Sequence, residues 1–244
     1  MKRDAFALMA DAEQSHWWYR GRRDFIAAAL ERVAPPPGAH ILDAGCGSGG
    51  NLEVLARFGK VSGFEYDAEA MHVARERQIG PVEPGALPGP IPFGDQRFDA
   101  IGLFDVLEHL EQPVDSLVAL RQRLVDGGAL VLTVPANPWL WGPHDVQCQH
   151  FRRYTAATLR DHLTSAGFVV EYLSYFNSLL LPLAIAQRIK ERVAGYDLEA
   201  MPGGGMNGLL HRIWRIERRW IPTRVAPFGL SLIAIARRAT PADG

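Results

Sequence analysis

A glycine-rich turn flanked by acids is the part of the chain whose residue types point most directly to chemistry. A short apolar run ends at Asp43, and Gly45, Cys46 and Gly47 follow at once. Glycines at the end of a buried strand allow a sharp turn and let a ligand approach the backbone without meeting a Cβ atom. We therefore expect this turn to hold a nucleoside-like cofactor.

Two classes of cofactor compete for the turn. Gly45, Gly47 and Gly50 satisfy the G-x-G-x-x-G dinucleotide fingerprint, which favours NAD(P). Asp43 favours S-adenosylmethionine instead, because a carboxylate repels a pyrophosphate and attracts a cationic sulfonium amino acid. Glu65 ends the next apolar segment, where either ligand presents a ribose diol. S-adenosylmethionine is favoured, and an NAD(P)-binding oxidoreductase or a non-catalytic adenosyl-binding module remain alternatives.

A second group of reactive side chains follows the apolar segment Ala129–Val134. It contains Trp141, His144, Asp145, His150, Arg152, Arg153 and Tyr154. Loops at the carboxyl ends of strands bind ligands in open α/β sheets, so we expect the substrate here. His144, or His109 on an earlier loop, is the candidate general base, and Asp145 and Tyr154 are further catalytic candidates.

The other members of this group are expected to contact the substrate. Arg152 and Arg153 can clamp an anionic group, or they form an ordinary solvated pair. Trp141 and His150 are assigned to the same substrate side. The spacing of the histidines matches no compact metal-ligand motif, so we expect no metal ion.

Composition describes an ordinary soluble enzyme. The 244 residues are 48% hydrophobic and carry a formal net charge of −1, which allows a sizeable core and implies no general affinity for nucleic acid. Two cysteines offer no disulfide framework, and the first residues lack an apolar signal region. We expect a cytoplasmic protein.

The elements that position these residues follow from alternating apolar segments. Strands are predicted at Ile41–Asp43, Val61–Glu65, Ala100–Phe104, Ala129–Val134, Val169–Tyr175 and Leu230–Ala236. Alternation of such segments with helical stretches predicts a doubly wound α/β sheet. A helix is expected before Pro35, another over Ala156–Ala166 with Thr155 as its N-cap, and a loop over Gln78–Phe93.

Together with the segment Arg97–Leu110, these features resemble the class I S-adenosylmethionine-dependent methyltransferases, in particular the ubiquinone-methyltransferase-like group. In that family an L-D-x-G-C-G-x-G loop, an acid ending the second strand and an F-D-x-x-x-x-x-D-V-L-E-H-L run recur in this order. The resemblance covers most of residues 16–176. It implies a Rossmann-like seven-stranded sheet with helices on both faces, an extended C-terminal helical insertion, and S-adenosylhomocysteine as product.

The resemblance also implies roles for residues around the cofactor. Asp43 and the backbone of Gly45, Cys46 and Gly47 would hold the methionine end, and Glu65 would bind the ribose. Tyr66 would pack on the adenine. Phe104 and Asp105 would lie beneath the sulfonium.

Two further contacts are implied at the ends of the cofactor. Arg23, or second Arg22, would pair with the methionine carboxylate, and Trp18 and Tyr19 would roof the pocket. Family members present an acid to the adenine, but this sequence has alanine there. Adenine contacts are therefore expected from the backbone of Ala86 and Leu87.

The expected organisation is a single methyltransferase domain over residues 1–244. It comprises a helical cap (1–37), a cofactor-binding core (38–176), a helical insertion or lid (177–227) and a last strand (228–238). In the insertion, apolar residues at helical spacing predict a basic amphipathic helix packed on the domain by that stripe: Leu209, Ile213, Ile216 and Trp220, beside Arg212, Arg215 and Arg219. Contact with a membrane surface is the alternative role. The acceptor is expected to be a small molecule or a lipid- or glycan-linked intermediate, methylated on oxygen, nitrogen or carbon.

Overall fold

The computed structural model describes residues 16–194 and 204–238. The start of the expected N-terminal cap and residues 195–203 of the expected insertion lie outside these ranges. A seven-stranded sheet has the order β3-β2-β1-β4-β5-β7-β6. The strands are β1 (His40–Ala44), β2 (Lys60–Glu65), β3 (Val82–Pro84), β4 (Phe98–Phe104), β5 (Leu124–Pro135), β6 (Phe168–Phe176) and β7 (Ser231–Arg238). Strands β1 to β5 are parallel, and β7 runs antiparallel to both β5 and β6.

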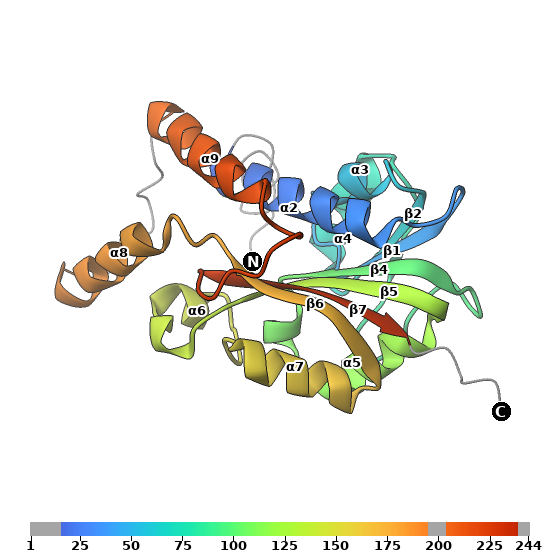
Figure 1. Cartoon of the computed structure of the whole chain (residues 1–244). Helices are drawn as coiled ribbons and strands as arrows, with labels where there is room; N and C mark the ends of the chain where they lie inside the picture. The colour runs from blue at the N-terminus through green and yellow to red at the C-terminus, as the bar shows by residue number, and fades with distance from the viewer. Residues whose placement is uncertain (1–15, 195–203, 239–244) are drawn as a thin grey trace.

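Helices cover both faces of this sheet, as expected (Figure 1). They are α2 (Trp17–Val33), α3 (Leu52–Leu55), α4 (Ala68–Glu76), η1 (Leu107–His109), α5 (Pro113–Gln122), η2 (Pro138–Leu140), α6 (Pro143–Gln147), α7 (Ala156–Ser165), α8 (Leu181–Ala194) and α9 (Gly204–Arg218). Helices α2 and α9 lie on one side of the sheet and α5 and α7 on the other. None of the described helices is both long and apolar enough to cross a bilayer.

The apolar runs of the central strands are buried on both faces. Neighbouring residues of a strand point to opposite sides, so Ile41 packs in the core beneath α2 while Leu42 packs in the core against α5 and α7. Val131 and Leu132 of β5 divide in the same way. The continuous hydrophobic segments of the sequence therefore become the central layer of the molecule.

Helix ends follow their local sequence signals. Helix α2 stops at Ala34, whose φ of 49° is left-handed and whose N–H bonds to the Leu30 carbonyl, just before the prolines. The Oγ1 of Thr155 accepts a hydrogen bond from the N–H of Thr158, which confirms it as the N-cap of α7.

Helix α9 forms as predicted, but the face expected to pack on the domain was wrong. Leu209, Ile216 and Trp220 are exposed, whereas Trp214 on the neighbouring face is 1% exposed. Trp214 stacks on aromatic rings of α2 and β6, and Gly21 leaves room for it, since a Cβ atom there would lie 2.0 Å from the indole. Burial of this large side chain sets the rotation of the helix.

The segment Gln78–Phe93 contains the seventh strand, which the sequence interpretation had missed. Val82 is buried and pairs with Gly63 of β2, and Pro84 ends the strand. Three residues on a sheet edge that close with a proline give almost no period-2 signal. The proline and glycine content suggested only a loop.

Candidate functional site

A cavity of about 1470 Å³ lies over the carboxyl ends of β1, β2 and β4. The turn after β1 forms one wall, and residues of α2, α8 and α9, including Trp18, Leu183 and Leu210, form the other. Binding sites for one small molecule usually measure roughly 300–1000 Å³. The cavity is therefore large enough for a cofactor and a second molecule together.

The turn after β1 needs its glycines for two different reasons. Gly45 has φ of 72°, and a Cβ atom on it would lie 2.9 Å from Cγ2 of Val106. Gly47 has φ of 55°, and a Cβ atom there would meet no protein atom within 4 Å. Because Gly47 also lines the cavity, its backbone presents an open face to a ligand. Such a cradle suits close approach of a nucleoside-type molecule.

Glu65 is held rigidly at the end of β2. Its Oε2 accepts a hydrogen bond from the N–H of Gly47 at 2.8 Å, and its Oε1 accepts from the N–H groups of Tyr66 and Asp67 at 2.9 and 3.0 Å. The carboxylate lines the cavity. Its fixed position beside the glycine turn is suited to a pair of ligand hydroxyls.

Asp105 directly follows β4 and is paired with Arg22 of α2. The Nη1 of Arg22 donates to Oδ2 of Asp105, and Oγ1 of Thr133 donates to Oδ1 at 3.1 Å. The Asp105 backbone is left-handed, with φ of 52°, a strained conformation for this residue type that is found at functional sites. The Arg22 guanidinium also stacks 4.9 Å from the centre of the Trp18 ring. The pair ties α2 to the strand end.

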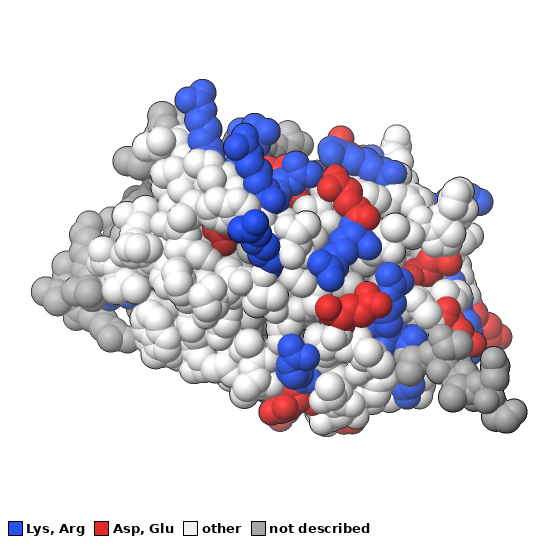
Figure 2. All heavy atoms as spheres, viewed as in Figure 1, with Lys and Arg blue, Asp and Glu red and all other residues white. Residues whose placement is uncertain are grey.

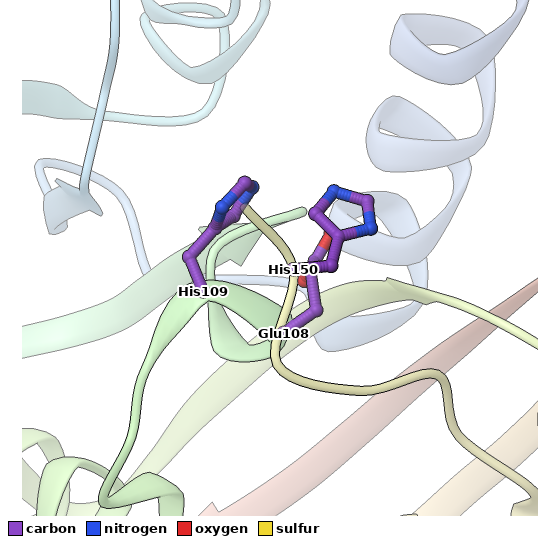
Figure 3. A group of neighbouring side chains, drawn as sticks. All are labelled: Glu108, His109 and His150. Carbon is purple, nitrogen blue, oxygen red and sulfur yellow. The ribbon is translucent and has the colours of Figure 1, made fainter. Parts of the chain in front are cut away.

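Two histidines and a glutamate converge at the other end of the cavity (Figure 3). The His109 and His150 rings meet edge to face, with centroids 4.6 Å apart. Glu108 is 1% exposed, and burial together with the charge of Asp105 raises its pKa well above the usual range. Burial and the neighbouring His150 lower the pKa of His109 to about 4. At neutral pH the His109 ring is therefore a neutral acceptor.

Asp145 lies behind this group and organises it. Its Oδ1 is 2.9 Å from Nδ1 of His150 and accepts a hydrogen bond from Nε of Arg153 at 2.7 Å. Although burial opposes ionisation, the bonds from His150 and Arg153 hold the pKa of Asp145 well below its usual range. Asp145 is a buried anion that orients two cavity residues.

Most of the residues singled out in the sequence line this cavity. They are Trp18, Tyr19, Arg23, Gly45, Cys46, Gly47, Glu65, Tyr66, Ala86, Leu87, Phe104, Asp105, His109, His144, His150 and Arg153. The N–H of Ala86 already donates to the Pro90 carbonyl, so of the two N–H groups of that expected pair the one on Leu87 is the candidate for a ligand. Tyr66 is 84% exposed at the edge of the cavity.

Five expected site residues do not line it. Tyr154 is buried in the core on the far side of the sheet, beside His162, so a catalytic role does not fit its place. Arg152 donates to the Glu111 carbonyl, and Trp141 stands outside the cavity. Asp43 is buried below the glycine turn, and Asp145 lies behind His150. For the four residues between Trp141 and Tyr154, side-chain direction, which spacing in a loop does not determine, separates them from their neighbours.

Several residues of the cavity were not expected from the sequence. Glu108 precedes His109 in the motif run, so its place beside that histidine was the available signal. Leu183 and Arg188 of α8 and Leu210 of α9 carry no comparable motif. They reach the cavity because both helices fold back over it.

Comparison with known proteins identifies a methyltransferase family. A methyltransferase domain family matches residues 18–173. A "probable S-adenosylmethionine-dependent methyltransferase" of Mycolicibacterium smegmatis is 28% identical over 65% of this chain and 62% of its own length. The mitochondrial ubiquinone biosynthesis O-methyltransferase of Schizosaccharomyces pombe is 35% identical over 46% of this chain and 43% of its own length. The matches thus span less than two thirds of either relative.

A solved structure extends the likeness to the fold of nearly the whole chain. The S-adenosylmethionine-dependent methyltransferase of Archaeoglobus fulgidus superposes with a TM-score of 0.58 at 17% identity, covering 94% of this chain and 99% of that one. The family match covers more than half of the sequence, and the sheet, glycine turn and acids agree with it. The chain belongs to the class I S-adenosylmethionine-dependent methyltransferase family.

Proposed function

We propose that the chain transfers a methyl group from S-adenosylmethionine to an oxygen, nitrogen or carbon nucleophile of a small molecule or a lipid- or glycan-linked intermediate. The observation that carries this proposal is the single cavity that runs from the glycine turn and Glu65 to His144 and His150. One compartment can thus hold donor and acceptor in contact. Positioning of this kind supplies roughly 7–11 kcal/mol in well-oriented reactions.

The residues at the glycine end fit S-adenosylmethionine. The open face of Gly47 can lie against the ligand, and Glu65 can accept hydrogen bonds from two ribose hydroxyls. Arg22 is the better candidate for the methionine carboxylate, because it reaches the cavity beside Asp105, whereas Arg23 also lines a separate cavity of about 330 Å³. When bound, S-adenosylmethionine supplies a methyl carbon that its sulfonium makes electrophilic.

We call the part of the cavity lined by His144 and His150 the acceptor end. Histidines supply the proton chemistry there. Burial lowers the pKa of His144, so the ring is neutral at neutral pH and can accept a proton from an acidic acceptor. Loss of turnover in His144→Ala with cofactor affinity unchanged supports this role, and full activity excludes it. The free thiols of Cys46 and Cys148, both in the cavity wall, suit a reducing compartment such as the cytoplasm.

Calorimetric titration tests the cofactor directly. We expect S-adenosylmethionine and S-adenosylhomocysteine to bind and NAD to produce no heat. Glu65→Ala should weaken both sulfur ligands by about tenfold or more, since charge-assisted hydrogen bonds contribute about 1.5–3 kcal/mol. Glu69→Ala is the matched control, because it removes a carboxylate that is exposed on α4. Binding of NAD alone would contradict the proposal.

We also propose that α9 contacts an anionic membrane surface. Leu209, Ile216 and Trp220 are about half exposed, and Arg212, Arg215 and Arg219 are exposed among them. Arginine side chains stand out over α9 and α2 in Figure 2. Apolar side chains flanked by arginines are typical of helices that lie in a lipid interface.

This surface adjoins the cavity, because Leu210 of the same helix lines it. A lipid-linked acceptor could therefore enter from the bilayer. Flotation with vesicles containing anionic lipid should carry part of the protein upward, while neutral vesicles should carry less. Trp220→Asp should reduce flotation, whereas Val169→Asp, a similar change at an exposed residue of β6, should not. Recovery of all protein in the soluble fraction with anionic vesicles would refute the contact.

A further inference from the structure

Two arginines from separate parts of the chain line the cavity at its acceptor end. Arg153 lies in the loop before α7, and Arg188 belongs to α8. Nε of Arg153 donates to Oδ1 of Asp145 at 2.7 Å, and Nη2 of Arg188 is 3.8 Å from Oδ2 of the same carboxylate. We propose that Arg188, assisted by Arg153, binds a carboxylate or phosphate group of the methyl acceptor, an inference that rests on the proposed methyl transfer.

The arginines stand between Asp145 and the cavity. The Asp145 side chain is 0% exposed and is not part of the cavity wall, whereas the side chains of Arg153 and Arg188 are 9% and 18% exposed and line the wall. A molecule in the cavity therefore meets guanidinium N–H groups rather than the carboxylate. The planar guanidinium donates two parallel hydrogen bonds to a carboxylate or a phosphate, which makes these anions its best-matched ligands.

The two arginines differ in how firmly the protein holds them. Arg153 donates from Nε to Asp145 and from Nη1 to the Ala136 carbonyl at 3.1 Å. The contact between Arg188 and Asp145, at 3.8 Å, is an ion pair that is too long for a hydrogen bond. A ligand oxygen can therefore approach Arg188 without breaking a hydrogen bond to Asp145. We assign the main contact with the acceptor to Arg188 for this reason.

Gly142 provides the room in which the Arg188 guanidinium lies. A Cβ atom on Gly142 would be 2.6 Å from Nη1 and 2.9 Å from Cζ of Arg188. The Gly142 backbone is extended, with φ of −159° and ψ of −174°, a conformation that residues with side chains also adopt. The backbone therefore does not require glycine here. The close approach of the guanidinium does.

The surrounding charges favour an anion at this place. Burial and the charge of Asp105 raise the pKa of Glu108, so this cavity carboxyl group favours its neutral form and repels an anion less. Burial is the main cause of the lowered pKa of His144, and the charges of Arg188 and Arg153 add to it. The His144 ring is thus within electrostatic reach of both arginines. An acceptor anchored at Arg188 can place its nucleophile beside the proposed base.

The sequence suggested an anion clamp made of Arg152 and Arg153, and the fold gives the second position to a different arginine. Arg152 donates to the Glu111 carbonyl and does not line the cavity. Arg188 does line it, because α8 folds back over the acceptor end. The proposed clamp therefore joins a loop residue to a helix that follows β6, a pairing that spacing in the sequence does not reveal.

Titration of the full chain saturated with S-adenosylhomocysteine tests the clamp. The probes are two anions, 4-hydroxybenzoate and phenyl phosphate, each with a neutral counterpart, 4-hydroxybenzamide and phenol. We expect at least one anion to bind about tenfold or more tightly than its counterpart, since hydrogen bonds to charged groups are the stronger ones. The anion with the larger preference identifies the acceptor group as a carboxylate or a phosphate.

Substitutions show whether Arg188 is the source of that preference. Arg188→Gln should lower the affinity for the anion about tenfold and leave that for the neutral counterpart within twofold, whereas Arg188→Lys should keep part of the preference, because it retains the charge without the planar fork. Gly142→Ala should also weaken the anion, since the new methyl group displaces the guanidinium. Arg160→Gln removes an exposed arginine of α7 and is the matched control, expected to change neither affinity.

Equal binding of anions and neutral counterparts by the unmodified chain overturns the inference. A preference that survives Arg188→Gln, or that Arg160→Gln removes equally, overturns the assignment to Arg188. Titration with S-adenosylhomocysteine alone, and of the free chain with the anions, separates this inference from the proposed function. If S-adenosylhomocysteine binds and the preference is absent, only the clamp fails; if it does not bind while the anions bind through Arg188, methyl transfer fails and the clamp stands.

Discussion

Adding one methyl group at Gly45 or at Gly47 should have different consequences, although both glycines belong to the same turn. Both have left-handed backbones, which cost an alanine about 1–2 kcal/mol. At Gly45 the new Cβ atom also lies 2.9 Å from Cγ2 of Val106. Overpacking of this kind costs about 1–3 kcal/mol more. Gly47→Ala meets no protein atom, so its loss of stability should stay near the backbone value alone.

Urea denaturation of a double-mutant cycle measures this difference. Val106→Ala removes the methyl groups that crowd residue 45, so it should couple to Gly45→Ala by about 1–3 kcal/mol. With Gly47→Ala the coupling should be below about 0.5 kcal/mol. The six tryptophans provide the fluorescence signal.

Ligand affinity should separate the two variants again. The methyl group of Gly47→Ala enters space that we assign to the cofactor, so affinity for S-adenosylhomocysteine should fall about tenfold, or about 1.4 kcal/mol. Unchanged affinity in a folded Gly47→Ala protein would show that the cofactor does not lie against this glycine. Equal destabilisation by both alanines, or no coupling to Val106, would refute the packing argument.

Three further predictions concern the surroundings of the site. Trp214→Ala should lower the free energy of unfolding in urea denaturation by about 3–5 kcal/mol, because its indole is buried. Trp220 is half exposed, so Trp220→Ala should lower it by about 1 kcal/mol or less. Similar losses of stability in the two variants would contradict the rotation described for α9. Burial raises the pKa of Glu217 above 4.5, so the native state favours its protonated form and stability should fall as pH rises from about 4.5 through the raised pKa. Glu217→Gln should lack that part of the decline in urea denaturation at a series of pH values, and identical slopes would show that the glutamate does not titrate there. Asp145→Asn should destabilise the protein by about 3–5 kcal/mol, since it leaves the buried charge of Arg153 without its anion; a loss below 1 kcal/mol would mean that other groups neutralise this arginine.

The sequence was sufficient to predict the central strands of the sheet and the part of the site around the glycine turn. Strands such as Ala100–Phe104 are continuous apolar runs, and the turn at Gly45 and Gly47 follows directly from residue type. These features depend on local backbone preference and on burial on both faces, which neighbouring residues determine. The prediction of α/β class and family rested on them.

The acceptor end could not be predicted as well, because it depends on long-range packing. The rotation of α9 is set by Trp214 against Gly21, almost two hundred residues earlier in the chain. Tyr154 and His150 belong to one short loop, yet one side chain enters the core and the other the cavity. Loop side chains have no period from which their direction can be read.

The insertion of β7 between β5 and β6 makes α8 and α9 part of one connection with fixed ends. Phe176, at the end of β6, is paired with Ser231, at the start of β7. The described residues between these two that do not pack on α2, unlike Trp214, can change in length or sequence while the sheet keeps its register, and doubling a loop costs only about 0.6 kcal/mol in closure entropy. The glycine turn lies outside this connection, on strands paired elsewhere in the sheet. The architecture therefore offers an exchangeable module for altering acceptor choice, by grafting or directed evolution, without rebuilding the donor half.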